Sequence, residues 1–431
     1  MRSGDTIVAL SSGAPPSGVA VIRLSGPAVP QILAQVAGSV PEPRRMVLRP
    51  IGLDSVLDRG LVAYFPAPHS FTGEDCAELQ VHGSPAGVRA ILKLLTGQGA
   101  RLAEAGEFTR RAFENGKLDL VEIEGLGDLL QAETENQRRQ ALARFEGGLS
   151  RQIDDWRNRL LDLRAEIEAR LDFSDEGDVA DGLPAQFGDD IAVLKSSIGT
   201  ALASIEHGRI VREGIRVALA GVPNAGKSSL LNALARSDIA IVTDEAGTTR
   251  DVREVPLDIA GQLFVLLDLA GLRETDSKAE AEGVRRARHA IELADIVLWL
   301  TAPDTPDMVP PLVSVPMLHI ATKSDLGNAN VAADIAVSAQ TGAGLNELFA
   351  RLRAIGETMG TGEPTLLSRE RDRLALQEAS AALDAAAARL DDMELAAENL
   401  RQASFALERL VGRLDAERVL DRLFMSFCIG K

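Results

Sequence analysis

Hydrophobic and polar residues alternate differently in successive parts of the chain, and the first part predicts an α+β domain. Over residues 1–118, short apolar runs at 19–24 and 61–65 stand among glycines and prolines, and helical spacing is found at 86–98 and 108–115. Short strands mixed with a few helices are typical of an α+β domain. We therefore expect a first domain that ends near residue 118.

From residue 119 the apolar residues follow a helical spacing. They recur three or four positions apart along 151–173, and residues 368–425 have the same texture. This period predicts amphipathic helices. The acidic, glycine-containing stretch 174–184 is predicted to be a loop between two of them. The residues that set the period in 151–173 are Ile153, Trp156, Leu160, Leu163, Ile167 and Leu171.

Residues 215–358 have a third pattern, in which short apolar strands alternate with helical segments. This alternation indicates a parallel, doubly wound α/β sheet. Since helical parts precede and follow it, the simplest interpretation is an α/β domain inserted into a helical one. The predicted fold is multidomain α/β plus α, with an α+β domain at 1–118, helical parts at 119–214 and 359–431, and the inserted domain at 215–358.

The composition is that of a folded chain without membrane spans. Of 431 residues, 45% are hydrophobic and 25% are charged, which is near the average for globular domains. No apolar run reaches the roughly 18 residues of a membrane-spanning helix, and the amino terminus lacks the long apolar stretch of a secretory signal. The two cysteines, Cys76 and Cys428, favour a reducing compartment, and we expect the cytoplasm.

Acidic residues outnumber basic ones by 63 to 46, which gives a net charge of -17. Nucleic-acid backbones are bound chiefly by Lys and Arg, so the surface as a whole is not expected to bind a nucleic acid unaided. The excess is uneven, because residues 1–118 carry 12 basic and 10 acidic side chains.

A glycine-rich segment follows the predicted strand at 215–220 and opens a helical run. Its sequence, Gly221-Val-Pro-Asn-Ala-Gly226-Lys227-Ser228, has the spacing of a phosphate-binding P-loop. The glycines let backbone N–H groups turn toward phosphate oxygens at a helix amino terminus, which favours anions. We expect Lys227 against the β- and γ-phosphates and the Ser228 hydroxyl on Mg²⁺. The alternative, a turn with a solvated lysine, fits the strand and helix context poorly.

Two motifs with the character of GTPase switches follow the P-loop. Residues 247–251 offer threonine hydroxyls for Mg²⁺ and the γ-phosphate, and Asp268 ends a buried strand where a carboxylate near Mg²⁺ belongs. Leu272 stands where Ras-like enzymes carry the glutamine that orients the attacking water. An apolar side chain cannot do this, so another group must. Acidic candidates downstream are Glu274, Asp276, Glu280 and Glu282.

The fourth motif, Thr322-Lys323-Ser324-Asp325, favours guanine over adenine. Asp325 can accept both N–H groups of the Watson–Crick edge of guanine, and Ser338 would help to close the base pocket. Thr322 replaces the usual asparagine and has no amide to brace the loop. This suggests the hypothesis that nucleotide affinity is modest and that Thr322→Asn would tighten binding. Asn224 in the P-loop either ligates a monovalent cation or braces its own loop, and the sequence leaves both open.

Several segments together resemble the MnmE family, also called TrmE, of bacterial tRNA-modification GTPases. The resemblance covers essentially the whole chain and includes the terminal Cys428-Ile-Gly-Lys431. The other segments that carry it are GVAVIRLSGP (18–27), GEDCAELQVHG (73–83), GEFTRRAFENGKLDL (106–120), GVPNAGKSSLLNAL (221–234), IVTDEAGTTRD (241–251) and DLAGLRETD (268–276).

The resemblance implies a folate-binding, homodimerising amino-terminal domain and a helical domain interrupted by a GTPase domain. It implies that the chain acts with the flavoprotein MnmG, which carries the FAD, to add an aminomethyl-type (carboxymethylaminomethyl) group at C5 of the wobble uridine of tRNA. The one-carbon donor would be 5-formyl- or methylene-tetrahydrofolate, and K⁺-dependent dimerisation of the GTPase domains would stimulate GTP hydrolysis. Because the chain is acidic, we expect MnmG to hold most of the tRNA in a heterotetramer.

The resemblance also implies roles for individual residues. Glu280, three residues before Gly283, would orient the attacking water, and Ser228 and Thr249 would hold Mg²⁺. The implied K⁺ ligands are Asn224 and the backbone of Thr243, Glu245 and Thr248, and the implied folate residues are Arg23, Glu78, Lys117 and Lys431. The full set expected at GTP is Asn224, Ala225, Gly226, Lys227, Ser228, Ser229, Thr243, Asp244, Glu245, Ala246, Gly247, Thr248, Thr249, Asp268, Leu269, Ala270, Gly271, Thr322, Lys323, Asp325, Ser338 and Ala339.

Other interpretations fit parts of the sequence. Taken without the resemblance, the four folate residues are ordinary surface ion-pair residues. A switch-type ribosome-assembly GTPase shares the nucleotide motifs but usually adds an RNA-binding module, and no KH-like GXXG with a basic surface is found. A folate-dependent aminomethyltransferase would leave the GTPase motifs unexplained. Cys428 is followed by Gly and Lys without a polybasic segment, so prenylation is not expected, and the role of its thiol stays open.

Overall fold

A computed structural model gives the structure of the protein. It describes residues 4–172, 182–241, 253–268, 291, 293–306, 309–310, 312–327, 333–360 and 365–412. Most of the predicted loop at 174–184 therefore lies outside the described residues. Contacts divide the chain into two units. One holds the described residues of Met1–Gly127, Ser150–Arg164 and Leu400–Lys431, and the other holds those of Asp128–Leu149 and Ala165–Asn399.

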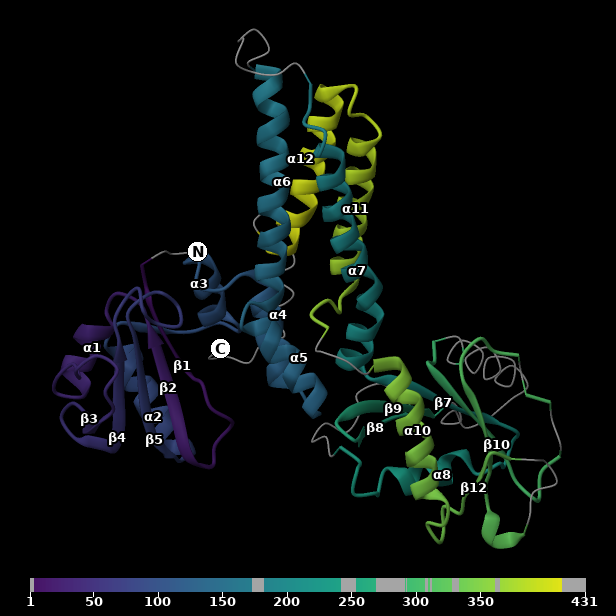
Figure 1. The fold of residues 1–431 in the computed structure, drawn as a ribbon. Helices are drawn as coiled ribbons and strands as arrows, with labels where there is room; N and C mark the ends of the chain where they lie inside the picture. Colours follow the sequence, from purple (N-terminus) through teal and green to yellow (C-terminus); the bar gives the residue numbers. More distant parts are fainter. Residues whose placement is uncertain are drawn as a thin grey trace, which may run out of the picture. The chain divides into compact units, whose positions relative to one another are not determined.

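The amino-terminal domain is built on a six-stranded sheet of order β3-β4-β5-β2-β1-β6. Neighbouring strands are antiparallel except for β1 and β6. Helices α1 and α2 cover one face of the sheet (Figure 1), where Ile22, Leu24, Ile32 and Ile91 are buried in one core. The strands are β1 (Thr6–Leu10), β2 (Ser17–Ser25), β3 (Val47–Gly52), β4 (Val56–Phe65), β5 (Cys76–Gly83) and β6 (Ala100–Leu102).

The opposite face of this sheet is covered by a smaller cluster in which Ile7 and Phe108 are fully buried and Phe71 packs against them. Phe108 comes from α3. Polar residues of β2 alternate with the core residues and point to this face. The predicted α+β character is confirmed, and the expected helices at 86–98 and 108–115 are α2 and α3. The helices of this part are α1 (Val29–Val36), α2 (Pro85–Gly97) and α3 (Glu107–Glu114), and α4 (Leu120–Gln131) begins the part that follows.

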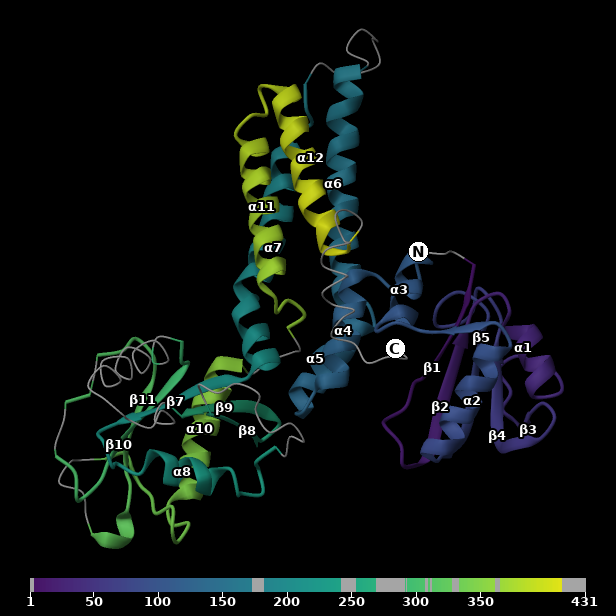
Figure 2. The same ribbon diagram turned by 180° about the vertical axis from the view of Figure 1, so that it is seen from behind.

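The α/β part has a six-stranded sheet of order β12-β11-β10-β7-β9-β8. All neighbouring strands are parallel except for β8 and β9, as expected of an inserted P-loop domain. Figure 2 shows this sheet from behind. The sequence pattern does not predict β8, because this strand contains Pro256 and charged residues. An edge strand tolerates both. The elements are β7 (Ile215–Gly221), α8 (Lys227–Leu234), β8 (Arg253–Ile259), β9 (Gln262–Asp268), β10 (Ile296–Thr301), β11 (Met317–Ala321), β12 (Ile335–Ala336) and α10 (Leu345–Gly360).

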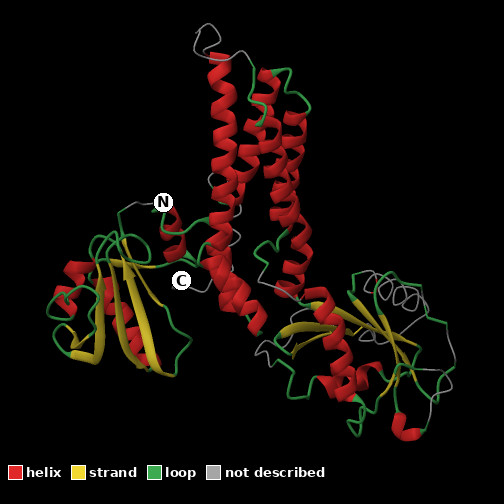
Figure 3. Ribbon diagram, viewed as in Figure 1, coloured by secondary structure: helices red, strands yellow, loops and turns green. Residues whose placement is uncertain are grey.

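Helices of different lengths make up the rest of the described chain (Figure 3). Apolar side chains of α7 and α11, among them Leu194, Ile198, Leu376 and Leu383, are buried. No helix in the described ranges is long and apolar enough to cross a membrane. The predicted helical texture before and after the α/β part is confirmed. These helices are α5 (Glu135–Phe145), α6 (Gly148–Asp172), α7 (Phe187–Glu213), α11 (Glu370–Ala387) and α12 (Met393–Leu410).

Candidate functional site

The P-loop lies between the carboxyl end of β7 and the first residue of α8. Gly221 has a φ of +142°, and a Cβ there would lie 2.2 Å from the carbonyl oxygen of Leu300 on β10. Gly226 has a φ of +80° and caps α8. Both positions therefore require glycine, because a side chain would clash at the first and strain the backbone at the second. The backbone can then present N–H groups at the amino end of α8.

Lys227 and Asn224 lie within this loop as the motif predicts. The Nζ atom of Lys227 donates to the carbonyl oxygens of Gly221 and Val222, at 3.0 and 2.9 Å. The lysine side chain thus folds over the loop and donates to its carbonyl oxygens, in the place where the motif predicts phosphate. Asn224 has a φ of +63°, a left-handed conformation that asparagine tolerates better than most residues. The P-loop therefore holds Asn224 in the left-handed backbone region.

Thr322 joins the guanine motif to the P-loop. Its buried hydroxyl donates to the carbonyl oxygen of Ala225 at 2.6 Å, and the Thr301 carbonyl oxygen lies 3.0 Å away. The backbone N–H of Thr322 already donates to Thr301 at 2.8 Å, so the single hydroxyl proton is available to Ala225. A hydroxyl therefore braces the P-loop here, although the usual amide is missing.

A cavity of about 210 Å³ opens between α8 and the loops that follow β11 and β12. Asp325 lines it, and the Ser338 hydroxyl donates to Asp325 Oδ1 at 2.6 Å. The backbone N–H of Thr341 donates to the same Ser338 hydroxyl at 3.2 Å. Ser338 thus holds the carboxylate that is expected to read guanine. The other lining residues are Gly226, Ser229, Leu230, Thr322, Lys323, Leu326, Val337, Ala339 and Gln340.

The switch motifs are described only in part. β9 runs beside β7 with Asp268 in register with Leu219, so the backbone of Asp268 reaches the carboxyl edge of the sheet next to the P-loop. The other expected switch and terminal residues lie outside the described residues: Thr243, Asp244, Glu245, Ala246, Gly247, Thr248, Thr249, Leu269, Ala270, Gly271, Glu280, Cys428 and Lys431. In the described part, no group of three or more His, Cys, Asp or Glu side chains could hold a metal ion.

Arg23 and Glu78 lie together on the sheet face that carries Phe71 and Phe108. Their Cα atoms are in register between β2 and β5, and Arg23 Nη2 donates to Glu78 Oε1 at 2.9 Å. The guanidinium lies over both rings, 5.3 Å from the Phe71 centroid and 5.9 Å from that of Phe108. The pair stays partly exposed, at 22% and 23% of the side-chain surface. Arg23 is therefore both the partner of a surface carboxylate and part of an aromatic platform.

Lys117 reaches the same region through the loop at 70–75. Gly73 has a φ of +81°, and a Cβ there would lie 3.2 Å from Lys117 Cγ. The loop therefore passes closely over the lysine stem, two residues after Phe71. Glu74 of this loop is held by Arg111, whose Nη1 donates to Glu74 Oε2 at 3.0 Å. Of the four expected folate residues, Arg23 and Lys117 thus contact one loop, and Glu78 pairs with Arg23.

Phe71, Phe108 and Arg111 were not predicted as site residues. Each lies inside or beside a segment of the family resemblance, GEFTRRAFENGKLDL for Phe108 and Arg111. Their position in or beside a family segment is the one sequence signal that could have identified them. Their contacts with Arg23 and Glu74 could not be predicted, because those contacts join residues far apart in the chain.

Taken together, the strand, P-loop and helix of β7–α8, the guanine motif after β11 and the doubly wound sheet define a P-loop GTPase. Two family models match the chain, "MnmE helical domain" over residues 120–428 and "GTP-binding protein TrmE N-terminus" over residues 6–117. The chain belongs to the MnmE family of tRNA modification GTPases, and it is a GTP-hydrolysing enzyme.

Curated relatives named tRNA modification GTPase MnmE match over their full length. That of Azorhizobium caulinodans is 54% identical over 441 residues, with 100% of both chains covered. That of Rhizobium johnstonii is 51% identical, with 99% of both covered. Among solved structures, Aquifex aeolicus Era bound to GDP and AlF4⁻ is 26% identical over 34% of this chain and 57% of its own, with a TM-score of 0.26.

Proposed function

We propose that the chain, with the flavoprotein MnmG, adds a carboxymethylaminomethyl-type group to C5 of the wobble uridine of tRNA. The observation that carries this proposal is the full-length match to relatives named for tRNA modification. The proposed domains are 1–118, 119–214, 215–358 and 359–431, with the third inserted into the helical domain. Because tRNA is the proposed substrate, the cytoplasm is the proposed compartment. MnmG, and not this acidic chain, would hold most of the tRNA.

The amino-terminal site is proposed to bind a tetrahydrofolate, which would supply the one-carbon unit. The residues present fit such a ligand. Arg23 and Lys117 offer cationic groups to the carboxylates of its glutamate tail, and Glu78 can accept from the amino edge of a pterin. Phe71 and Phe108 add apolar faces beside Arg23, on which a flat ring can pack. Lys431 is proposed as the fourth folate residue.

At the GTPase site, Lys227 is proposed to neutralise the β- and γ-phosphates, and Ser228 and Thr249 to hold Mg²⁺. Glu280 is proposed to orient the water that attacks the γ-phosphate, since Leu272 offers no polar group there. Mg²⁺ keeps several waters and phosphate oxygens as ligands, so it needs few ligands from the chain. Asn224 is proposed to hold K⁺ with backbone atoms of Thr243, Glu245 and Thr248.

The chain is proposed to work as a homodimer through its amino-terminal domain. Support comes from β3, which is the edge strand of its sheet, and from the apolar side chains around it. Leu48 is 64% exposed, Val56 56% and Leu53 51%. Exposed apolar side chains gathered at a sheet edge are typical of a protein interface.

Nucleoside mass analysis of wobble uridines tests the proposed function. Cells carrying Glu280→Ala or a Lys431 deletion are expected to lose the modified uridine, whereas the control Glu282→Ala, another acid of the same segment, is expected to keep it. Unchanged modification in both of the first two strains would contradict the proposal. If Glu280→Ala lowers GTP turnover but leaves the wobble uridine modified, the chain acts as a GTPase in another process.

A further inference from the structure

The β8–β9 hairpin connects both switch motifs to a distant point of the fold. β8 begins two residues after Asp251, at the end of the first switch motif, and β9 ends at Asp268, which opens the second. Each strand has seven residues, so the hairpin spans roughly 20 Å from the switches to its turn. A displacement of the switches that tilts the strands is therefore carried to the turn at Ala260 and Gly261.

This turn is docked on the first turn of α5. Ala260 and Gly261 have φ values of +54° and +84°, both positive as a two-residue type I′ hairpin requires. The Gly261 carbonyl oxygen accepts from the backbone N–H of Asn136 at 3.1 Å. That N–H belongs to the first helical turn and has no acceptor within its own helix. The hairpin thus completes the end of α5.

Gln262, the first residue of β9, ties the turn to a second helix. The residue is 8% exposed, and its Nε2 donates to the carbonyl oxygen of Ile210 in α7 at 3.0 Å. The Oε1 atom of Gln262 lies 3.5 Å from Asn136 Nδ2. The turn, α5 and the end of α7 therefore meet around one buried amide.

A row of polar side chains on α5 forms hydrogen bonds to the two segments that connect the GTPase part to the helices, one before it and one after it. Gln137, Gln140 and Arg144 are spaced to lie on one helix face. Gln137 donates to the carbonyl oxygen of Arg212 at 2.9 Å, near the end of α7, and Gln140 donates to that of Thr365 at 2.7 Å, just before α11. Arg144 has no exposed surface and donates to Leu366. One short helix thus contacts the hairpin and both crossing segments.

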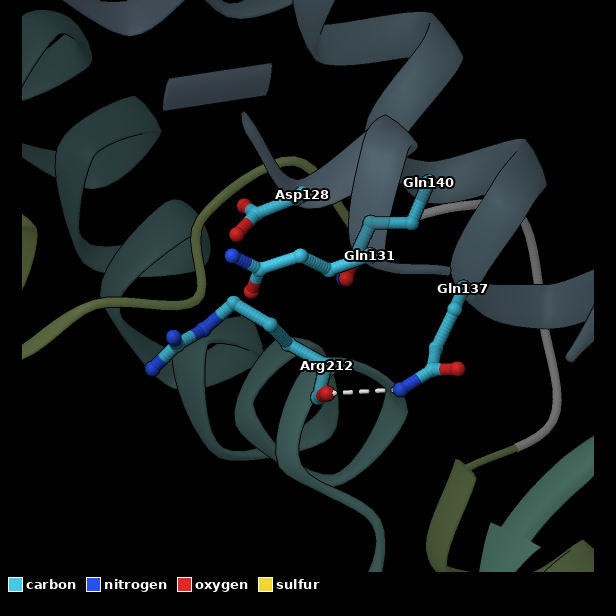
Figure 4. Close-up of a pocket in the computed structure, with 5 residues that line it drawn as sticks. All are labelled: Asp128, Gln131, Gln137, Gln140 and Arg212. Carbon is cyan, nitrogen blue, oxygen red and sulfur yellow. Dashed lines mark hydrogen bonds between the residues drawn. The ribbon is translucent and has the colours of Figure 1, made fainter. Parts of the chain in front are cut away.

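The space beside this row is a polar cavity of about 130 Å³, lined by Asp128, Gln131, Gln137, Gln140 and Arg212 (Figure 4). Asp128 Oδ1 accepts from Arg369 at 2.7 Å. Its Oδ2 and the Nε of Arg212 are buried without a hydrogen-bond partner in the described part of the chain. A polar cavity of this size holds water. Water can exchange partners as helices shift, whereas a close-packed apolar contact resists shifting.

We propose that α5 is the element that couples the GTPase site to the helical domain. The hairpin turn and α5 move as one body, and the wet cavity between α4, α5 and α7 takes up their displacement. α4 begins three residues after Lys117, so along the chain α5 leads through α4 toward the proposed folate site. The inference rests on GTP hydrolysis and does not depend on the tRNA reaction.

Amide hydrogen exchange on the full chain tests the coupling, with GDP compared against a non-hydrolysable GTP analogue. Amides of residues 135–145 are expected to change their exchange rate by about tenfold between the two nucleotides, which is an ordinary size for coupling between sites. Amides of the P-loop at 224–229 report nucleotide binding in the same samples. A P-loop response without any response in α5 would overturn the proposal.

Asn136→Pro removes the N–H that donates to Gly261 and the side-chain amide beside Gln262, but no bond within α5, since proline is tolerated in a first helical turn. It is expected to abolish the α5 response. Glu135→Pro, one residue earlier, is the matched control, because Thr134 before it is already extended (φ -127°, ψ 160°) and suits a following proline. Gln262→Met provides a second disruption should Asn136→Pro misfold. A full α5 response in both disrupting variants would contradict the proposal.

A reversible crosslink between the hairpin turn and α5 distinguishes two possibilities. The two elements either move together or must come apart during the GTPase cycle. A Cβ on Gly261 would lie 3.6 Å from Glu135 Cβ, which is a disulfide distance. Because the φ of Gly261 is +84°, any side chain there strains the turn, and the single variant Gly261→Cys measures the effect of that strain alone. In Glu135→Cys/Gly261→Cys, oxidation is expected to leave both the α5 response and GTP turnover within about twofold of the reduced protein. The proposal that the turn and α5 move together would be contradicted if oxidation abolishes GTP turnover and reductant restores it. The single-cysteine variants must show no such loss.

Discussion

The hydroxyl of Thr322 donates to the carbonyl oxygen of Ala225 at 2.6 Å, so the loop proposed to read guanine is tied directly to the P-loop. The sequence led to the hypothesis that a threonine braces the P-loop poorly. The geometry changes that expectation, because the hydroxyl makes the bridging bond itself. The two loops proposed to recognise the base and to bind the phosphates are therefore linked by one buried hydrogen bond.

Thr322→Val keeps the shape of the side chain and removes this bond. The buried Ala225 carbonyl then lacks its partner, which costs about 1–2 kcal/mol, so GDP affinity is expected to fall by roughly tenfold. Thr322→Ser keeps the hydroxyl and serves as the control. We expect Thr322→Asn to remain within about threefold of the wild type, since the bridge already exists. Nucleotide titration measures all three, and unchanged affinity in Thr322→Val would contradict the role of the hydroxyl.

Asp325→Asn is expected to exchange guanine for xanthine specificity. The carboxylate held by Ser338 at 2.6 Å accepts from guanine N–H groups, whereas an amide can donate to the carbonyl that xanthine carries at C2. Loss of two bonds to a charged acceptor predicts a fall in GTP affinity of roughly 100-fold. Turnover of GTP and XTP by the same variant measures the exchange. A variant that loses both nucleotides equally would show a folding defect, which Asp334→Asn, an exposed carboxylate nearby, is expected not to have.

Asn224 provides a test of the proposed monovalent cation. If its amide holds K⁺ beside the phosphates, GTP turnover is expected to be at least about tenfold faster in K⁺ than in Na⁺, and Asn224→Ala is expected to reduce this ratio to near one. Asn399→Ala, which removes an amide that donates within its own helix, should leave the ratio unchanged. Equal turnover of the wild type in the two salts would refute the role given to Asn224.

The sequence predicts local parts of the site well and distant contacts poorly. The P-loop consists of residues adjacent in the chain, so the motif from Gly221 to Ser228 is enough to predict the strand, the turn and the helix. The contact of Arg23 with Phe71 and Phe108 depends instead on how a loop and α3 cross a sheet, which no local pattern records. The motif order predicts that Asp325 and Ser338 share a pocket, but not that a hydrogen bond joins them.

Helix α5 is the clearest example of what sequence patterns miss. Its residues are mostly polar, and arginine is usually exposed, so the segment has the composition of a solvated helix. Arg144 nevertheless has no exposed surface and lies 3.4 Å from the equally buried Asp372. The acceptors that make this burial possible lie beyond the inserted domain in sequence. Hydrophobic periodicity therefore cannot reveal which face of a helix is buried when that face is polar.

Acid is expected to destabilise the amino-terminal domain through Glu107. Burial opposes ionisation of this carboxyl, but hydrogen bonds from Arg101, the Glu104 N–H and Arg111 outweigh it and lower its pKa below the ordinary 4.5. A pKa lowered on folding gives stability that is complete above the unfolded pKa and is lost as pH falls through the folded one. Unfolding of the wild type should therefore become steeply easier below about pH 4.5.

Glu107→Gln removes that titration. It is expected to be less stable at pH 7 by about 1–3 kcal/mol, because two arginines lose a charged partner, and to lose less stability than the wild type between pH 5 and about pH 3. Calorimetry on the full chain measures both effects. Glu42→Gln is the control, since the Glu42 side chain is 65% exposed beside Arg45 and such pairs contribute little. If Glu107→Gln follows the wild type in its pH dependence, the carboxylate does not carry the acid sensitivity.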